Sequence, residues 1–262
     1  MKTRPCAVAG MFYPRDPSHL GQLLESFFSK TTTGESALGI VSPHAGYIYS
    51  GQIAAHAFSS ISPDFSGTFI VIGPSHRGYL TSVSSIPWET PLGIVDMDTE
   101  FIKVLDIVID EPSQNEEHSI EVQMPFIKYR FPRSRVVPIM MGEQDPAHAA
   151  VVAEKIIAAH LLTKRDIRII ASSDFSHYVP EAQAKDGDLF AIEALTRLDT
   201  NEFYRRIREK RVTACGYGPI SVMVSVCKSM GAQEGRLIQY GTSGDVTGDR
   251  SEVVGYAAFA VI

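Results

Sequence analysis

Four of the eight histidines lie in short segments rich in Gly, Pro, Ser and Asp, close to apolar runs. These residues are His44, His76, His118 and His177. Imidazole is the commonest side-chain metal ligand, and it also exchanges protons near neutral pH. In α/β folds, the loops that follow strands gather reactive side chains at one rim of the sheet. The pattern therefore predicts one shared site, and a metal site best explains it.

His44 and His76 occupy equivalent positions, because each stands beside glycine and proline directly after an expected strand. A rigid turn of this kind fixes the ring direction that a metal ion needs. One such histidine alone is more often a turn or helix cap. Two in matching strand-end positions favour metal ligation.

His177 follows Asp174 by three residues in the segment SSDFSHY. A carboxylate can hold an imidazole in one tautomer and raise its basicity, as a general acid or base requires. Asp174 could equally cap a helix beside an unrelated histidine. Both interpretations stay open at this point.

His118 stands between Glu117 and Glu121. On a helix, the two glutamates would share a face, and acidic residues are favourable at a helix start. The spacing of three between His118 and Glu121 also occurs in carboxylate-bridged metal sites. We expect His118 and Glu117 to support the site or to face its substrate.

Cys215 lies just before an expected helix start, a location that lowers a thiol pKa and favours the thiolate. A thiolate can act as a metal ligand or as a nucleophile. Cys227 lies in an apolar helical run and is expected in the core. A thiol or hydrolytic enzyme that uses Cys215 with His177 is an alternative, although its third, orienting group is not identifiable.

The composition limits the partners. The 262 residues carry a net charge of -6 and contain no long Lys/Arg run, which disfavours a nucleic-acid partner. Three cysteines argue against a disulfide framework and favour a reducing cytoplasm. The longest apolar stretch, residues 253–262, is shorter than the roughly 20 residues that cross a bilayer. We therefore expect a cytoplasmic protein without a membrane segment.

Apolar runs of strand length alternate with helical patterns along the whole chain. Strands are expected at 38–42, 68–73, 135–140, 167–171, 236–240 and 253–262, and helices at 52–61, 99–108, 147–162, 181–198, 200–211 and 220–230. This alternation predicts a single α/β domain over 1–262, with a central, mostly parallel or mixed sheet flanked by helices. Residues 31–35, 79–94 and 239–251 are expected to be irregular, the last as a surface loop or a flap.

The motifs together make the chain resemble the Memo family. The matching segments are RPCAVAGMFYP at 4–14, PHAGY at 43–47, YSG at 49–51, GPSH at 73–76, EHSIE at 117–121, SDFSHY at 173–178 and the CG pair at 215–216. The resemblance implies a fold similar to the class III, LigB-type extradiol dioxygenases. In those enzymes two histidines and a glutamate hold a non-haem Fe(II), and another histidine acts as acid or base.

By this resemblance, His44 and His76 take the histidine ligand positions and His177, with Asp174 beside it, takes the acid/base position. Cys215 takes the position of the carboxylate ligand. A thiolate is softer than a carboxylate and favours copper, zinc or thiolate-bound iron, so ring cleavage is not implied.

The resemblance implies a metal-binding protein with iron or copper, or zinc in their place, and with redox or O2 chemistry. Whether the protein is an enzyme is left open. The alternative is a non-catalytic module that binds a peptide or a small molecule in a dioxygenase-like pocket. Eukaryotic members of the family bind phosphotyrosine peptides.

Overall fold

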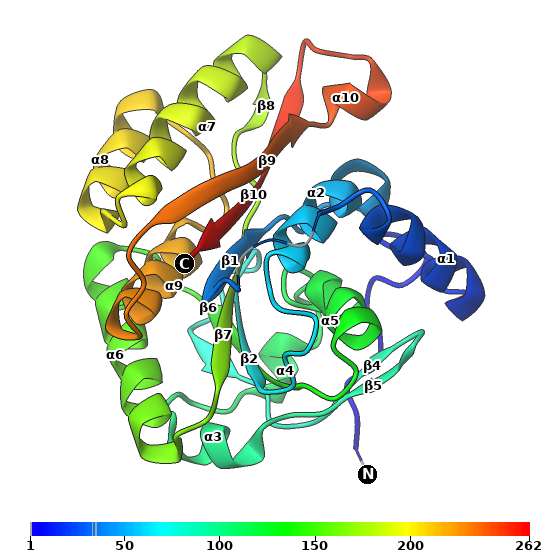
Figure 1. Cartoon of the computed structure of the whole chain (residues 1–262), viewed down its shortest axis with the longest axis vertical. Coiled ribbons are helices and arrows are strands. Elements are labelled where there is room, and N and C mark those ends of the chain that lie inside the picture. The colour runs from blue at the N-terminus through cyan, green and yellow to red at the C-terminus, as the bar shows by residue number, and fades with distance from the viewer. Residues whose placement is uncertain (1, 33, 35) are drawn as a thin grey trace.

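A mixed sheet forms the centre of the fold in the computed structural model, which describes residues 2–32, 34 and 36–262 (Figure 1). Within these residues the sheet has eight strands, in the order β3-β6-β2-β7-β1-β10-β8, with β9 paired to β10. The strands are β1 (Gly39–Ser42), β2 (Thr68–Pro74), β3 (Ser82–Val83), β6 (Arg135–Met141), β7 (Ile167–Ser172), β8 (His177–Val179), β9 (Gly235–Thr242) and β10 (Val253–Val261). A separate hairpin joins β4 (Trp88–Thr90) to β5 (Gly93–Val95).

The four neighbouring strands β6, β2, β7 and β1 run parallel, whereas β3, β8, β9 and β10 pair antiparallel. All seven residues of β2 are buried, as expected for a strand that is covered on both faces. The register places Ser42 of β1 opposite Ser172 of β7. The carboxyl ends of β1, β2 and β7 therefore meet at one edge of the sheet.

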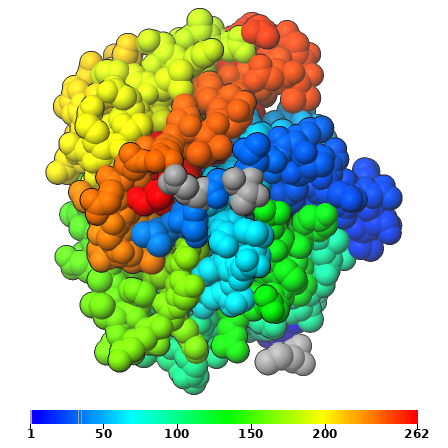
Figure 2. Space-filling view, in the orientation of Figure 1, coloured from blue at the N-terminus to red at the C-terminus, as the bar shows by residue number. Residues whose placement is uncertain are grey.

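Helices cover both faces of the sheet: α9 packs on β7, β1 and β2, whereas α2 packs on β1, β10 and β9 (Figure 1). The helices are α1 (Pro17–Phe28), α2 (Tyr47–Ser59), α3 (Thr99–Val104), α4 (Glu111–Gln114), the 3-10 turn η1 (Glu121–Gln123), α5 (Met124–Arg130), α6 (Pro146–Thr163), α7 (Glu181–Thr196), α8 (Thr200–Lys210), α9 (Tyr217–Ser229) and α10 (Gly244–Thr247). Strand β9 lies at the surface, as the orange band in Figure 2 shows.

The predicted fold class is confirmed: the chain forms one α/β domain with a mixed sheet between helices. All six expected strands are present, with ends within two residues of the expected ones. Asp98, Asp145 and Asp199 cap helices, and each accepts backbone hydrogen bonds from the first turn that follows it.

Several boundaries differ from the expected ones. Helix α2 begins at Tyr47, five residues before the expected start at 52. Helix α3 ends at Val104, and Asp106 then adopts a left-handed backbone with φ of 54°. Residues 79–94 contain strands, and residues 239–251 contain the end of β9 and helix α10. In segment 31–35, residues 33 and 35 lie outside the described residues.

A buried ion pair ties the N-terminal segment to the loop before α5. The Arg4 guanidinium donates to the Glu121 carboxylate, and both side chains are almost fully buried. Glu121 also accepts from the backbone N–H groups of Ala7 and Val8, at 2.9 Å each, and from the Tyr13 hydroxyl at 2.7 Å. These donors fix Glu121 as a structural acceptor.

The expectation that Glu117 and Glu121 share a helical face is therefore wrong. Residues 115–120 form turns between α4 and η1, and Glu121 faces the N-terminal segment. Arg4 also donates to the backbone carbonyls of Gln114, Asn115 and Glu117, at 2.9, 3.2 and 2.9 Å. Arg4 thus holds this loop in place.

Among the described residues, no helix has both the length and the apolar character that crossing a membrane requires.

The substitution Glu121→Gln should lower the free energy of unfolding by about 3–5 kcal/mol, because it leaves Arg4 as an uncompensated buried charge. Urea unfolding followed by circular dichroism measures the change. Glu100→Gln is the matched control, since the ion pair between Glu100 and Lys103 is exposed, and we expect no measurable loss there. Equal stabilities of the two variants would contradict this role of Glu121.

Candidate metal centre

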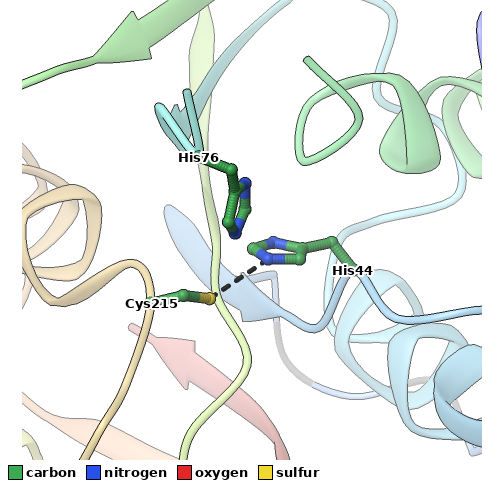
Figure 3. Close-up of side chains that lie close together, drawn as sticks. All are labelled: His44, His76 and Cys215. Atoms are coloured by element: carbon green, nitrogen blue, oxygen red, sulfur yellow. Dashed lines mark hydrogen bonds between the residues drawn. The ribbon is translucent and has the colours of Figure 1, made fainter. Parts of the chain in front are cut away.

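Three potential ligands converge at the carboxyl edge of the sheet: the His44 and His76 ring nitrogens and the Cys215 sulfur (Figure 3). One ligand atom from each lies within 4.8 Å of the other two. His44 follows β1 by two residues, His76 follows β2 by two, and Cys215 precedes α9 by two. The two rings lie 5.2 Å apart and are nearly perpendicular. The structure thus brings together the three residues that the sequence singled out as metal ligands.

The loop that carries Cys215 lies directly against the end of β7. The Gly216 N–H donates to Ser173 Oγ at 2.9 Å. A Cβ atom on Gly216 would lie 2.5 Å from the Ser172 carbonyl oxygen, so only glycine permits this approach. The Asp174 N–H donates to Cys215 Sγ at 3.1 Å. These contacts hold the sulfur next to His44.

Hydrogen bonds determine which nitrogen of His44 faces Cys215. The Ser172 hydroxyl donates its single proton to the Ser119 carbonyl at 2.6 Å and accepts from Gln123 Nε2 at 2.8 Å. At His44 Nδ1, 2.9 Å away, Ser172 can therefore only accept. Nδ1 carries the ring hydrogen, and the Nε2 lone pair points to Cys215 Sγ at 3.1 Å.

The Glu117 carboxylate orients His76 in the same way. It accepts from His76 Nδ1 at 2.9 Å, from the His76 N–H at 2.8 Å and from the Ser119 N–H at 2.8 Å. Burial raises the pKa of Glu117, but these hydrogen bonds outweigh burial and bring it to about 2. With the hydrogen on Nδ1, the neutral tautomer of His76 has its lone pair on Nε2, as in the carboxylate–histidine pairs of metal sites.

His118 lies beside these two rings. Its ring stacks on His76 at 4.5 Å and meets His44 edge-on at 5.5 Å. Its Nδ1 lies 3.4 Å from Glu117 Oε1, and Phe12 packs on it at 4.8 Å. His76, Glu117 and His118 form a second group with ligand atoms within 4.8 Å of one another. His118 and Glu117 thus adjoin the three converging donors.

His177 and Asp174 also reach this cluster, but their hydrogen bonds differ from the expected ones. The Thr213 carbonyl, rather than Asp174, accepts the hydrogen bond from His177 Nδ1, at 3.0 Å. Asp174 Oδ1 accepts from the His44 N–H at 2.9 Å, and Asp174 Oδ2 lies 3.9 Å from His44 Nε2. Asp174 lies between β7 and β8, so it caps no helix. With Cys215, the two residues form a third group of ligand atoms within 4.8 Å.

The difference has a structural reason. Strand β8 begins at His177 and pairs antiparallel with β10, and the His177 N–H donates to Thr213 Oγ1 at 2.7 Å. The backbone N–H and the ring Nδ1 of His177 therefore both face the loop between α8 and α9. Because a carbonyl only accepts, Nδ1 of His177 carries a hydrogen, and the neutral tautomer has its lone pair on Nε2.

The site favours a neutral His44 imidazole and a neutral Cys215 thiol. Burial and the neighbouring His118 and His76 lower the pKa of His44 well below its usual value. Burial and the Asp174 carboxylate raise the pKa of Cys215 well above its usual value. The expectation that a helix start lowers the pKa of Cys215 is therefore wrong for the protein alone, because burial and the Asp174 carboxylate raise this pKa. A cation among the three donors would reverse this effect.

Sequence reasoning missed Ser172, Gln123 and Thr213, the residues that hold His44 and His177. Ser172 could have been found, because it ends an expected strand beside Ser173 and Asp174. Gln123 and Thr213 carry no local signal, since they lie 49 residues from Ser172 and 36 residues from His177.

Ser172→Ala should weaken metal binding about 10–100-fold, because His44 Nδ1 loses its acceptor and the ring loses its fixed orientation. Competition of the protein with a chromophoric chelator for Zn²⁺ measures the affinity. Ser225→Ala on helix α9, whose hydroxyl donates to the Ser221 carbonyl, is the control. An unchanged affinity in a folded Ser172→Ala protein would show that this hydroxyl does not orient the ligand.

Comparison with known proteins supports the sequence motifs. Residues 4–260 match the family model described as "Memo-like protein". A MEMO1 family protein from Methanococcoides burtonii is 44% identical over 265 residues, which cover 98% of this chain and 99% of that protein. One from Archaeoglobus fulgidus is 42% identical and covers 95% and 96%. One from Methanococcus vannielii is 41% identical and covers 98% and 99%. This chain belongs to the Memo family.

Proposed function

We propose that this protein binds one transition-metal ion between His44, His76 and Cys215 and uses it for redox chemistry on a small molecule or O2. The observation that carries the proposal is the convergence of these three donors within 4.8 Å. The hydrogen bonds at both Nδ1 atoms strengthen it, because they leave each Nε2 lone pair available to an ion.

The donor set suits particular metals. Two imidazoles and one thiolate favour copper, iron or zinc over Mg²⁺ and Ca²⁺, which prefer oxygen ligands. Three protein ligands leave a coordination position open, as in catalytic rather than structural sites. Iron or copper would supply one-electron chemistry when bound, and zinc would supply Lewis-acid chemistry. We favour iron or copper as the native metal.

His177 is the candidate for proton transfer. Its ring is only partly buried, its Nδ1 hydrogen is donated to the Thr213 carbonyl, and its free Nε2 can accept a proton. Asp174 lies in the same ligand-atom group, and burial raises the pKa of its carboxyl. This residue pair would exchange protons with a ligand at the centre. Glu117 and His118 would orient and pack against His76.

Two other functions use the same residues. A non-catalytic module would bind a peptide or a small ligand in this pocket without the metal. A thiol enzyme would need an ionised Cys215, and the raised pKa of this thiol argues against it. The cytoplasmic location suggested by the cysteine content accompanies the metal proposal, since a reducing compartment keeps Cys215 available as a ligand.

Protein purified without oxygen should contain about one iron or copper ion per chain, and Cys215→Ala should lose most of it. Elemental analysis measures the content. Cys6→Ala is the matched control, because it removes a partly buried thiol outside the three ligand groups. Equal metal in all three proteins would refute the Cys215 ligand. Full ligand binding by metal-free protein would favour the non-catalytic module.

Metal binding at pH 7 should release about one proton, because the Cys215 thiol is protonated and His44 is already neutral. Calorimetric titration with Zn²⁺, repeated in buffers of different ionisation enthalpy, counts the protons. Cys215→Ala should bind more weakly and release none. Proton release that persists in this variant would assign the proton to another group.

A further inference from the structure

A cluster of positively charged side chains lies at the edge of the sheet opposite to the candidate metal centre. A cavity of about 370 Å³ opens at the amino ends of β2, β6 and β7. Four cationic side chains line it: Arg133, Arg135, Lys164 and Arg165. The whole chain carries a net charge of -6, so this cluster of positive charge is opposite in sign to the net charge of the protein.

Two acidic side chains line the same cavity, and both have partners. Asp98 Oδ2 accepts from the Thr68 hydroxyl at 2.6 Å and lies 3.1 Å from Arg165 Nε, and Asp98 Oδ1 accepts from the Phe101 N–H. Asp166 pairs with Arg168 at 2.5 Å. These contacts offset the charges of both acids.

Three cations remain without a counter-charge. Among the residues that the structure describes, the side chains of Arg133, Arg135 and Lys164 form neither a hydrogen bond nor an ion pair. Like charges gathered in one cavity repel each other, and a bound anion would remove this cost. In contrast, Arg205 and Arg206 on α8 are each paired with two glutamates.

The backbone conformation of two loops, at residues 66–68 and 164–166, defines the shape of this cavity. Helix α6 ends at Thr163, and its C-cap Lys164 adopts a left-handed backbone with φ of 53°, which turns residues 164–166 toward the start of β2. There a Cβ atom on Gly67 would lie 2.2 Å from the Asp166 carbonyl oxygen. The two loops therefore meet backbone to backbone at residues that line the cavity.

We propose that this cavity binds a small diphosphate-bearing molecule. Its three uncompensated cations match the roughly three negative charges of a diphosphate near neutral pH. Two of them are guanidinium groups, whose fork of N–H donors fits phosphate oxygens in a bidentate manner. The volume is within the range of small-ligand pockets. The site is independent of the proposed metal function.

Inorganic pyrophosphate is the probe, titrated into the purified protein by calorimetry at roughly physiological ionic strength. We expect saturable binding of one pyrophosphate per chain. The double variant Arg133→Gln/Arg135→Gln should weaken it about tenfold or more, because it removes two charge-assisted contacts. Both residues are exposed, so the variant should remain folded, which its thermal unfolding midpoint verifies.

The control variant Lys185→Gln/Arg208→Gln removes the same charge from exposed positions on α7 and α8 and should bind as the wild type does. Equal weakening in both variants would overturn the proposal, because it would reflect net charge alone. Equal binding of citrate would also overturn it, since the site would then not select phosphate. Binding that disappears in Cys215→Ala but survives in Arg133→Gln/Arg135→Gln would place pyrophosphate at the metal centre and refute this site.

Discussion

The candidate centre depends on the hydrogen bonds at the Nδ1 atoms of three imidazoles. Each ring donates to a group that can only accept there: the Ser172 hydroxyl, the Glu117 carboxylate or the Thr213 carbonyl. A neutral imidazole with its hydrogen on Nδ1 keeps the Nε2 lone pair for a metal ion or a proton. Without these acceptors the rings would have neither a fixed tautomer nor a fixed direction, and the convergence of donor atoms would have no chemical consequence.

The sheet supplies the geometry for these bonds. Parallel pairing of β1, β7 and β2 places the turns that carry His44 and His76 at the same edge, with Ser172 between them. Ser172 is fully buried and joins strand β7 to two other segments, since it contacts His44 after β1 and both Ser119 and Gln123 before α5. Each of these hydrogen bonds is buried, and buried hydrogen bonds fix the His44 ring rigidly, as a coordination site requires.

The sequence predicts the fold and the converging residues better than the bonds between them. β-branched runs that stop at glycine or proline indicate where strands end. The structure has His44 and His76 directly after such strand ends, as expected. Glu117 and Glu121 would share a face on a helix, but residues 117–120 form no helix, and Arg4, more than a hundred positions away, pairs with Glu121. The sequence left open whether Asp174 orients His177 or caps a helix, and in the structure the Thr213 carbonyl accepts the His177 ring hydrogen bond. Long-range hydrogen bonds leave no periodic signal in a single sequence, whereas packing does.

Arg4 has a wider effect than its distance along the chain suggests. Its guanidinium holds the backbone carbonyl of Glu117, and the Glu117 side chain in turn aligns His76. The first few residues of the polypeptide are thus mechanically coupled to the cluster of donors. An exopeptidase that trims the chain past this arginine, or a bulky affinity tag that crowds it, would loosen an imidazole without touching any residue of the cluster. If the proposed centre holds its metal, preparations that differ only at this end would then differ in their metal content.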